Sequence, residues 1–203
     1  MRTVMGIDSS LVRTGMTVLR LADDGTARPK VLRDCGYSLA NTAGFDESAE
    51  RIVSQAQTVT RVIDKYKPEL VLIEAMIPPK NALPSYLERG ALWYGIWSAL
   101  WARRIPRAII QPPTLKAWAT GTGRADKELV LGEVSKWWPG IAIANHDIAD
   151  SAVCAAMCAM KLGWQMPFRP RRRHFEGLRT VRWPEELAAP QLAALGSARF
   201  QGI

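Results

Sequence analysis

The feature that most constrains the fold is a short, wholly apolar run, LVLI at residues 70–73, which ends in the acid Glu74. Apolar residues on both faces are typical of a central strand that is covered on both sides, as in layered α/β proteins. An amphipathic pattern over residues 46–66 precedes the run and predicts a helix, which Pro68 ends. The chain is therefore expected to form a sheet with helices packed on its faces.

Strand and helix patterns alternate along the first 163 residues. Residues 3–8, 16–21 and 31–37 are expected to be three short strands joined by tight turns, which predicts an antiparallel meander. Helices are expected over residues 85–102, 114–120, 126–138 and 146–162, and a further strand over residues 107–110. Together these elements indicate an α/β fold with a mixed five-stranded sheet flanked by helices.

Beyond Gly163 the sequence changes character. Residues 169–173 read RPRRR, prolines are scattered, and hydrophobic periodicity is weak. We therefore expect one domain over residues 1–163 and a basic C-terminal extension over residues 164–203. The extension is expected to pack poorly or to become ordered only on a partner.

The charge balance bears on the partner. The chain has 27 Lys and Arg residues against 19 Asp and Glu residues, a net charge of +8, which suits nucleic acid first and an anionic membrane surface second. Its 3 cysteines argue against a disulfide framework, and no Cys-x-x-Cys pair favours structural zinc. No signal peptide or bilayer-spanning stretch is expected, so the prediction is a soluble, cytoplasmic protein without a membrane partner.

Four carboxylates stand out by position. Asp8 ends the first expected strand, Glu74 ends the central one, and Asp147 and Asp150 share one face of the last helix. Each alone could cap a turn or face solvent. Gathered at one sheet edge, they would repel one another unless a divalent cation neutralised them, and oxygen ligands favour Mg²⁺ or Mn²⁺. Such a set is typical of a two-metal site that cleaves phosphodiesters.

The same residues, taken in order, resemble the RuvC family of Holliday junction resolvases. The resemblance rests on GIDSSLVRTG at residues 6–15, LIE at 72–74, HDIADSA at 146–152 and a basic segment over 113–128. It implies a ribonuclease H-like fold, a homodimer and Mg²⁺-dependent nicking of branched DNA, with Asp8, Glu74, Asp147 and Asp150 as the catalytic, metal-binding acids. We expect two Mg²⁺ ions per site, which Mn²⁺ could replace. The Arg-rich extension is more similar to phage-encoded members, which would act in the host cytoplasm.

A set of basic residues is expected to contact DNA phosphates. Lys116 and Lys127 flank a glycine-rich loop that carries Arg124, although such a loop is also common as ordinary solvated surface. The resemblance favours DNA binding, and the whole expected set is Arg13, Lys80, Lys116, Arg124, Lys127, Arg171, Arg172 and Arg173. Cellular members of the family commonly place an aromatic wedge after the LIE strand. Here that position is Ile77, which would stack on bases less well.

The helix expected over residues 85–102 is apolar on most sides. Trp93, Trp97 and Trp101 recur every four residues, and Tyr94 and Leu100 extend the apolar surface beyond one face. We therefore expect one face to pack inward and the other to pack against a second copy of the chain. A two-fold dimer would match the symmetry of a four-way junction.

Two alternatives come from other classes of protein. A nucleotide-binding module of the actin and sugar-kinase type shares the topology, but it needs a second phosphate-binding half and a longer chain. A non-catalytic DNA-binding protein would keep only the basic surface, whereas this chain keeps all four acids. The prediction is therefore a nuclease that acts on branched DNA and uses no nucleotide cofactor.

Overall fold

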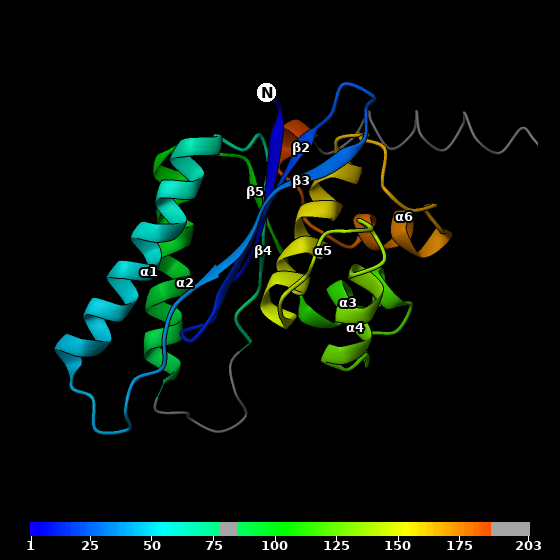
Figure 1. Cartoon of the computed structure of the whole chain (residues 1–203). Coiled ribbons are helices and arrows are strands. Elements are labelled where there is room, and N and C mark those ends of the chain that lie inside the picture. Colours follow the sequence, from blue (N-terminus) through cyan, green and yellow to red (C-terminus); the bar gives the residue numbers. More distant parts are fainter. Residues whose placement is uncertain (78–84, 188–203) are drawn as a thin grey trace, which may run out of the picture.

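A computed structural model describes residues 1–77 and 85–187, which fold around one sheet (Figure 1). Its strands are β1 (Thr3–Asp8), β2 (Thr14–Leu21), β3 (Ala27–Cys35), β4 (Val71–Glu74) and β5 (Arg107–Ile110). Their order across the sheet is β3-β2-β1-β4-β5. The β1–β2 and β2–β3 pairs are antiparallel, whereas β1–β4 and β4–β5 are parallel. The expected mixed five-stranded sheet is therefore confirmed.

The helices cover both faces of the sheet (Figure 1). Helices α1 (Phe45–Tyr66) and α2 (Tyr86–Ala102) lie on one face, and α3 (Pro112–Thr120), α4 (Lys127–Val134), α5 (His146–Lys161) and α6 (Arg172–Arg179) lie on the other. Strand side chains alternate between the two layers. Met5 and Ile7 pack with α1 and α2, whereas Val4 packs with α5. None of the described helices is both long enough and apolar enough to cross a membrane.

Some element boundaries differ from the expected ones. Strand β3 starts at Ala27 rather than at residue 31, because its ladder with β2 already begins at the Leu21–Ala27 pair beside the turn. Helix α4 ends at Val134 instead of residue 138. Beyond it the chain forms short turns, in which Trp137 N–H donates to Val134 O, so Trp137 reaches the core from a turn rather than from a helix.

Helix α5 is almost enclosed by the rest of the molecule. Every residue from 151 to 161 is buried, including Cys154 and Cys158, which pack as small core residues. The helix approaches the sheet closely because Gly6 has no side chain. A Cβ atom at Gly6 would lie 2.0 Å from Ser151 O. The buried hydroxyls of Thr17 and Ser151 share a 2.8 Å hydrogen bond across the same contact.

The chain beyond Gly163 packs more closely than the sequence indicated. Trp118 of α3 forms an aromatic cluster with Trp137, Phe168 and His174, and its Nε1–H donates to His174 O at 2.9 Å. Leu178 is also buried. The expectation of poor packing is therefore wrong for residues 164–187. This segment is held by isolated buried side chains, such as His174 and Leu178, and not by a regular apolar stripe. This explains why its sequence shows little hydrophobic periodicity. Residues 188–203 lie outside the described part of the chain.

Candidate active site

Three carboxylates from three elements meet at one edge of the sheet. Asp8 ends β1, Glu74 ends β4, and Asp150 lies near the start of α5. The parallel register of β1 and β4, in which Ile7 faces Ile73, brings the first two acids to the same edge. One carboxylate oxygen from each of the three acids lies within 4.8 Å of the others. We call Asp8, Glu74 and Asp150 the acid group.

Asp147, the fourth acid singled out in the sequence, lies beside the acid group rather than in it. It is in the first turn of α5, and its Oδ2 is 3.9 Å from Nε of Arg13, in the turn between β1 and β2. The charge of Asp147 raises the pKa of each member of the acid group. Asp147 is therefore close enough to add to their mutual repulsion.

The start of α5 is fixed to the sheet by Asn145. Its side-chain oxygen accepts a 3.0 Å hydrogen bond from Ile148 N–H and so caps the helix. Its Nδ2 donates to Asp34 Oδ2 of β3 at 2.6 Å. The helix carrying two of the acids is therefore held at its first turn to the strand two places away from β1.

Burial and like charges raise the pKa values of the acid group. Burial raises the pKa of Asp8 well above its usual range, and the charges of Glu74 and Asp150 raise it further. Burial followed by the charge of Asp150 raises the pKa of Glu74 to about 8. Burial, with the charge of Asp147 adding to it, raises the pKa of Asp150 to about 6. The full set of negative charges is stable at neutral pH only with a cation beside it.

The acid group fits a hard divalent cation. All its donors are carboxylate oxygens, which Mg²⁺ and Mn²⁺ prefer, and their spacing allows more than one carboxylate to bind the same ion. A bound cation would relieve the repulsion that raises the three pKa values. The donor set and its electrostatics thus fit the metal dependence expected from the sequence.

Two lysines partly offset the negative charge of the acid group. The charges of Lys116 and Lys127 lower the pKa of both Glu74 and Asp150, against the effect of burial. Lys116 Nζ also donates to Ala125 O at 2.9 Å, which ties α3 to the glycine-rich loop. Both lysines were expected to contact DNA, which stays a prediction, and their charges act on the same two acids.

His146 bonds locally at the start of α5. Its Nδ1 lies 3.2 Å from Lys127 O, and its Nε2 lies 3.2 Å from Glu128 Oε1. These contacts join the first turn of α5 to the first turn of α4. They match the local hydrogen-bonding role that is common for a histidine in the first turn of a helix.

The remaining basic residues of the expected set are spread over several elements. Arg13 and Arg124 are exposed in turns, and Arg171 and Arg172 are exposed at the start of α6. Arg172 forms a 2.6 Å ion pair with Glu176 one turn along the helix. Arg171 forms no ion pair within the described residues, so it is the freer of the two cations.

Arg173 differs from its neighbours in the arginine run. It is half-buried, and its guanidinium donates to Trp118 O at 3.1 Å and to Ala119 O at 2.9 Å. These carbonyls belong to the last turn of α3, where the backbone C=O groups have no hydrogen-bond partner within the helix. Arg173 therefore holds α6 against α3.

Of the two residues after β4 that were expected to contact the junction, the structure describes only the first. Ile77 is 50% exposed, at the end of the described segment that follows Glu74. Lys80 lies outside the described residues. An exposed aliphatic side chain three residues after Glu74 is compatible with a wedge, which stays a prediction.

A buried polar residue that the sequence pattern did not single out, Gln55, holds the turn after Asp8. Gln55 of α1 donates from Nε2 to Leu11 O at 2.5 Å, and its Oε1 accepts from Thr14 Oγ1 at 3.1 Å. Both partners flank Arg13, so Gln55 fixes the turn that carries it. A glutamine on the inward stripe of the helix pattern was the available signal.

Comparisons with known proteins identify the family. The model of the family described as crossover junction endodeoxyribonuclease RuvC matches residues 4–159. The protein of that name from Saccharopolyspora erythraea is 31% identical over 205 residues, covering 98% of both chains. Its counterpart from Streptomyces coelicolor is 29% identical over 182 residues, covering 89% of this chain and 92% of that protein.

Solved structures show the same fold. A Thermus thermophilus RuvC structure superposes with a TM-score of 0.62 at 22% identity, covering 82% of this chain and 99% of that one. T. thermophilus RuvC in complex with a Holliday junction substrate gives a TM-score of 0.62 at 20% identity, covering 76% and 91%. The ribonuclease H-like fold expected from the sequence is thus confirmed. With a family model that matches residues 4–159 and a relative aligned over 98% of its length, the chain belongs to the RuvC family of crossover junction endodeoxyribonucleases.

Proposed function

We propose that the protein is a metal-dependent endonuclease that nicks branched DNA, Holliday junctions first, by hydrolysing a phosphodiester at the acid group. The single observation that carries this proposal is the meeting of Asp8, Glu74 and Asp150 within 4.8 Å in a member of this family. The related Thermus protein, whose structure includes a Holliday junction substrate, supports branched DNA as the substrate class.

Asp8, Glu74 and Asp150 are the residues that would hold Mg²⁺, or Mn²⁺ in its place, with Asp147 as a fourth carboxylate. Two such ions, when bound, would lower the pKa of an attacking water and stabilise the leaving 3′ oxygen. Asp8 ends β1, the central strand of the sheet, so it would be the carboxylate best placed to serve both ions. Lys116 and Lys127 bind oxygens of the phosphate to be cut and orient it over the acids. Strand scission leaves a 5′ phosphate and a 3′ hydroxyl.

The exposed cations supply affinity rather than sequence preference. Arg13, Arg124 and Arg171 come from different elements and contact phosphates along the arms of the junction. Contacts of this kind are the same at every sequence, and they weaken as salt rises. The substrate is DNA, so we place the protein in the cytoplasm.

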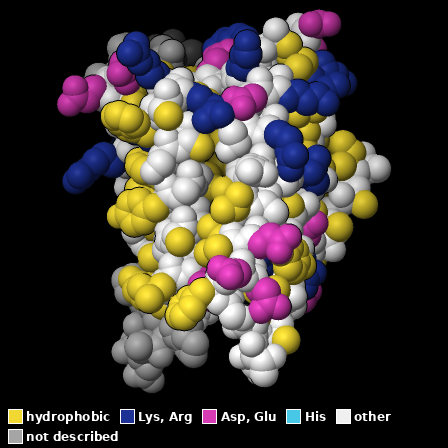
Figure 2. All heavy atoms as spheres, turned by 90° about the vertical axis from the view of Figure 1, so that its left-hand side faces the viewer, with side chains coloured by type: hydrophobic (Ala, Val, Ile, Leu, Met, Phe, Trp, Pro, Cys, Tyr) yellow, Lys and Arg dark blue, Asp and Glu magenta, His cyan; other side chains and the backbone are white. Residues whose placement is uncertain are grey.

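A second copy of the chain packs on α2 in this proposal. Leu87, Tyr94 and Trp101 recur every seven residues and are 80%, 62% and 67% exposed, whereas Trp93 and Leu100 are buried in the core. Figure 2 shows hydrophobic side chains gathered in a column on the side of the molecule formed by α1 and α2. Burying this stripe against its copy would give two active sites related by a two-fold axis, which suits a four-way junction.

The test is a cleavage assay with labelled linear, forked and four-way DNA. The wild-type protein is expected to nick four-way DNA with Mg²⁺ or Mn²⁺, and to bind without nicking in Ca²⁺. Asp8→Asn removes one anionic ligand, so its nicking rate should fall at least about 100-fold while junction binding persists. Asp23→Asn makes the same change at an exposed turn and serves as the control. A folded Asp8→Asn protein that nicks at the wild-type rate would refute the proposal.

A further inference from the structure

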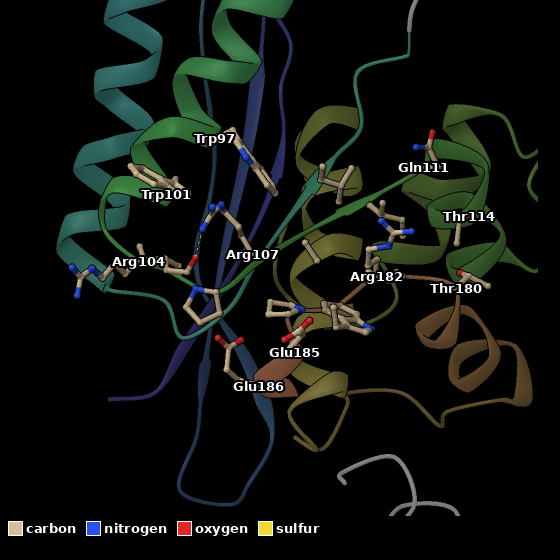
Figure 3. A pocket seen from close by; sticks show the side chains of 18 of the residues that line it. Trp97, Trp101, Arg104, Arg107, Gln111, Thr114, Thr180, Arg182, Glu185 and Glu186 are labelled. Carbon is tan, nitrogen blue, oxygen red and sulfur yellow. Dashed lines mark hydrogen bonds between the residues drawn. The ribbon is translucent and has the colours of Figure 1, made fainter. Parts of the chain in front are cut away.

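A groove of about 1170 Å³ runs along the outer edge of β5 (Figure 3). The end of α2 and the following loop form one wall, with Trp97 and Arg104, and residues 180–186 form the other. None of the four acids assigned to cleavage lines the groove. Its function is therefore a separate question from nicking.

The floor of the groove is a free strand edge, because β5 is the last strand of the sheet. Val71 N–H donates to Pro106 O, and Ala75 N–H donates to Ile110 O, so even-numbered residues face β4. In a parallel ladder, alternate residues direct their backbone groups to opposite sides. The N–H and C=O groups of Arg107 and Ile109 therefore point outward, and no hydrogen bond from residues 1–77 or 85–187 reaches them.

Arg107 gives the groove an unsatisfied positive charge. Its guanidinium lies 4.8 Å from the centre of the Trp97 ring, and Nη1 donates to Ile105 O at 3.1 Å. Its Nε is buried without a hydrogen-bond partner among the described residues, and burial lowers its pKa. A partly desolvated guanidinium with an unmade hydrogen bond is destabilising, and a carboxylate brought against this half-buried side chain would offset its charge.

The other charges of the groove favour an acidic occupant near Arg107. Arg104 and Arg182 line it as well, and neither is among the ion pairs found in the part of the chain that the structure describes. Glu185 and Glu186 lie together on the same wall as Arg182 (Figure 3). Three cations against two anions suit a segment with a single carboxylate and otherwise apolar or neutral residues.

A nucleic acid or a second copy of the chain fits the groove less well. The Trp97 ring is stacked on Trp93, with centroids 5.3 Å apart and planes 13° apart, and Arg107 covers it too, so it has no free face for a base. Trp101, the other tryptophan that lines the groove, belongs to the α2 stripe assigned above to the dimer. Pairing two β5 edges about a two-fold axis would bring the unpaired arginines of both copies together, which is repulsive. An extended peptide has neither difficulty.

We propose that this groove binds an extended segment of a partner protein, which adds a strand to the free edge of β5. Its backbone pairs with Arg107 and Ile109, an apolar side chain covers the 37% exposed Ile109, and a carboxylate contacts the Arg107 guanidinium. The proposal concerns protein recruitment and does not depend on the nuclease function.

The first test uses peptides on the wild-type protein. The probe is a fluorescein-labelled octapeptide of Val and Thr with one central Glu, and its binding is followed by fluorescence anisotropy. Replacing the Glu with Lys should weaken binding at least about tenfold, because the charge is then repelled. Methylating alternate backbone nitrogens should also abolish binding, because it removes the donors that pair with the strand.

The second test changes the groove. Ile109→Pro removes an outward N–H without touching the β4 ladder, and Ile109→Val keeps it as the matched control. Arg107→Met keeps an apolar stem on Trp97 but removes the charge. The Pro and Met variants should bind the peptide at least about tenfold more weakly, while their melting temperatures and junction nicking match the wild type.

Several results would overturn the proposal. Equal binding of the Glu peptide and its Lys or N-methylated form would exclude a charged strand partner. Competition by single-stranded DNA as strong as that by the peptide itself would assign the groove to nucleic acid. A concentration-dependent dimer that Ile109→Pro dissociates would assign it to a second copy.

Discussion

Gly15 of β2 lies directly against the backbone carbonyl of Asp147, at the start of α5. A Cβ atom at Gly15 would lie 2.0 Å from Asp147 O, which no real contact allows. Gly15 is also the residue paired with Asp8 across the β1–β2 ladder. Together with the contact of Gly6 on Ser151, this contact allows the close approach between the sheet that carries Asp8 and the helix that carries Asp147 and Asp150.

The first prediction concerns this contact. Gly15→Ala should push the first turn of α5 away from β2 and separate Asp150 from the other acids. A shift of about 1 Å in a catalytic group can cost about 100-fold in rate, so we expect a loss of that order in nicking. Junction binding should change little, because the basic residues lie on other elements. The measurement is single-turnover cleavage of four-way DNA beside a binding assay.

Gly132→Ala is the matched control for this substitution. Gly132 lies in α4, and a Cβ atom there would meet nothing within 4 Å. Alanine should leave nicking unchanged and raise the free energy of unfolding by about 0.5–1 kcal/mol. Wild-type nicking and melting temperature in Gly15→Ala would show that α5 can move without affecting the site.

The sequence predicted the convergence of acids but not its detail. An acid at the end of an apolar strand run has a known place at a sheet edge, so the positions of Asp8 and Glu74 follow from the pattern. Asp147 and Asp150 lie on one helix face and are equivalent by spacing alone. The seating of α5 on the sheet, against Gly6 and Gly15 and through the Asn145–Asp34 hydrogen bond, determines that Asp150 joins the acid group while Asp147 lies beside it.

The C-terminal segment shows where local pattern fails. Arg171, Arg172 and Arg173 are equivalent in a basic run, yet only Arg173 reaches the carbonyls at the end of α3. His174 gave no signal in the sequence and is 2% exposed beneath Trp118. Both roles depend on contacts with residues more than 50 positions away, and helical periodicity does not report such contacts.

The second prediction is that stability without metal falls as pH rises. The folded protein raises the pKa of Asp150 to about 6 and that of Glu74 to about 8, whereas the unfolded chain has ordinary values of about 4. Between these values the folded state binds more protons than the unfolded state, so the free energy of unfolding decreases with pH. The stabilisation is complete below about pH 4 and is lost as pH passes through about 6 and then 8.

Mg²⁺ should reverse this trend, because it binds only the deprotonated acids. We expect the rise in melting temperature on adding Mg²⁺ to EDTA-treated protein to grow from pH 5.5 to pH 8.5. Glu74→Gln should flatten the pH dependence in EDTA and reduce the Mg²⁺ effect. A melting temperature that is independent of both pH and Mg²⁺ in the wild type would argue against cation binding at the acid group.

The third prediction concerns the dimer. Tyr94→Glu puts a charge in the exposed stripe of α2, and a buried, unpaired carboxylate in an interface is strongly unfavourable. Sedimentation velocity at micromolar concentration should show a dimer for the wild type and a monomer for the variant. Leu129→Glu, at a 50% exposed site on α4 across the sheet, should remain dimeric. Equal masses for the two variants would place the dimer contact elsewhere or exclude it.

The fourth prediction separates the two functions within the arginine run. Arg171→Gln removes an exposed cation, so the slope of log affinity against log salt should become shallower by about 0.9, the value for one phosphate contact. The cut positions should stay the same, because phosphate contacts carry no sequence information.

Arg173→Gln instead leaves the carbonyls of Trp118 and Ala119 without their donors and should lower the free energy of unfolding by about 1–3 kcal/mol. Junction binding between 50 and 200 mM salt, together with urea denaturation, measures both effects. Moved cuts in Arg171→Gln would mean that α6 recognises junction structure, and unchanged stability in Arg173→Gln would mean that α6 does not depend on this anchor.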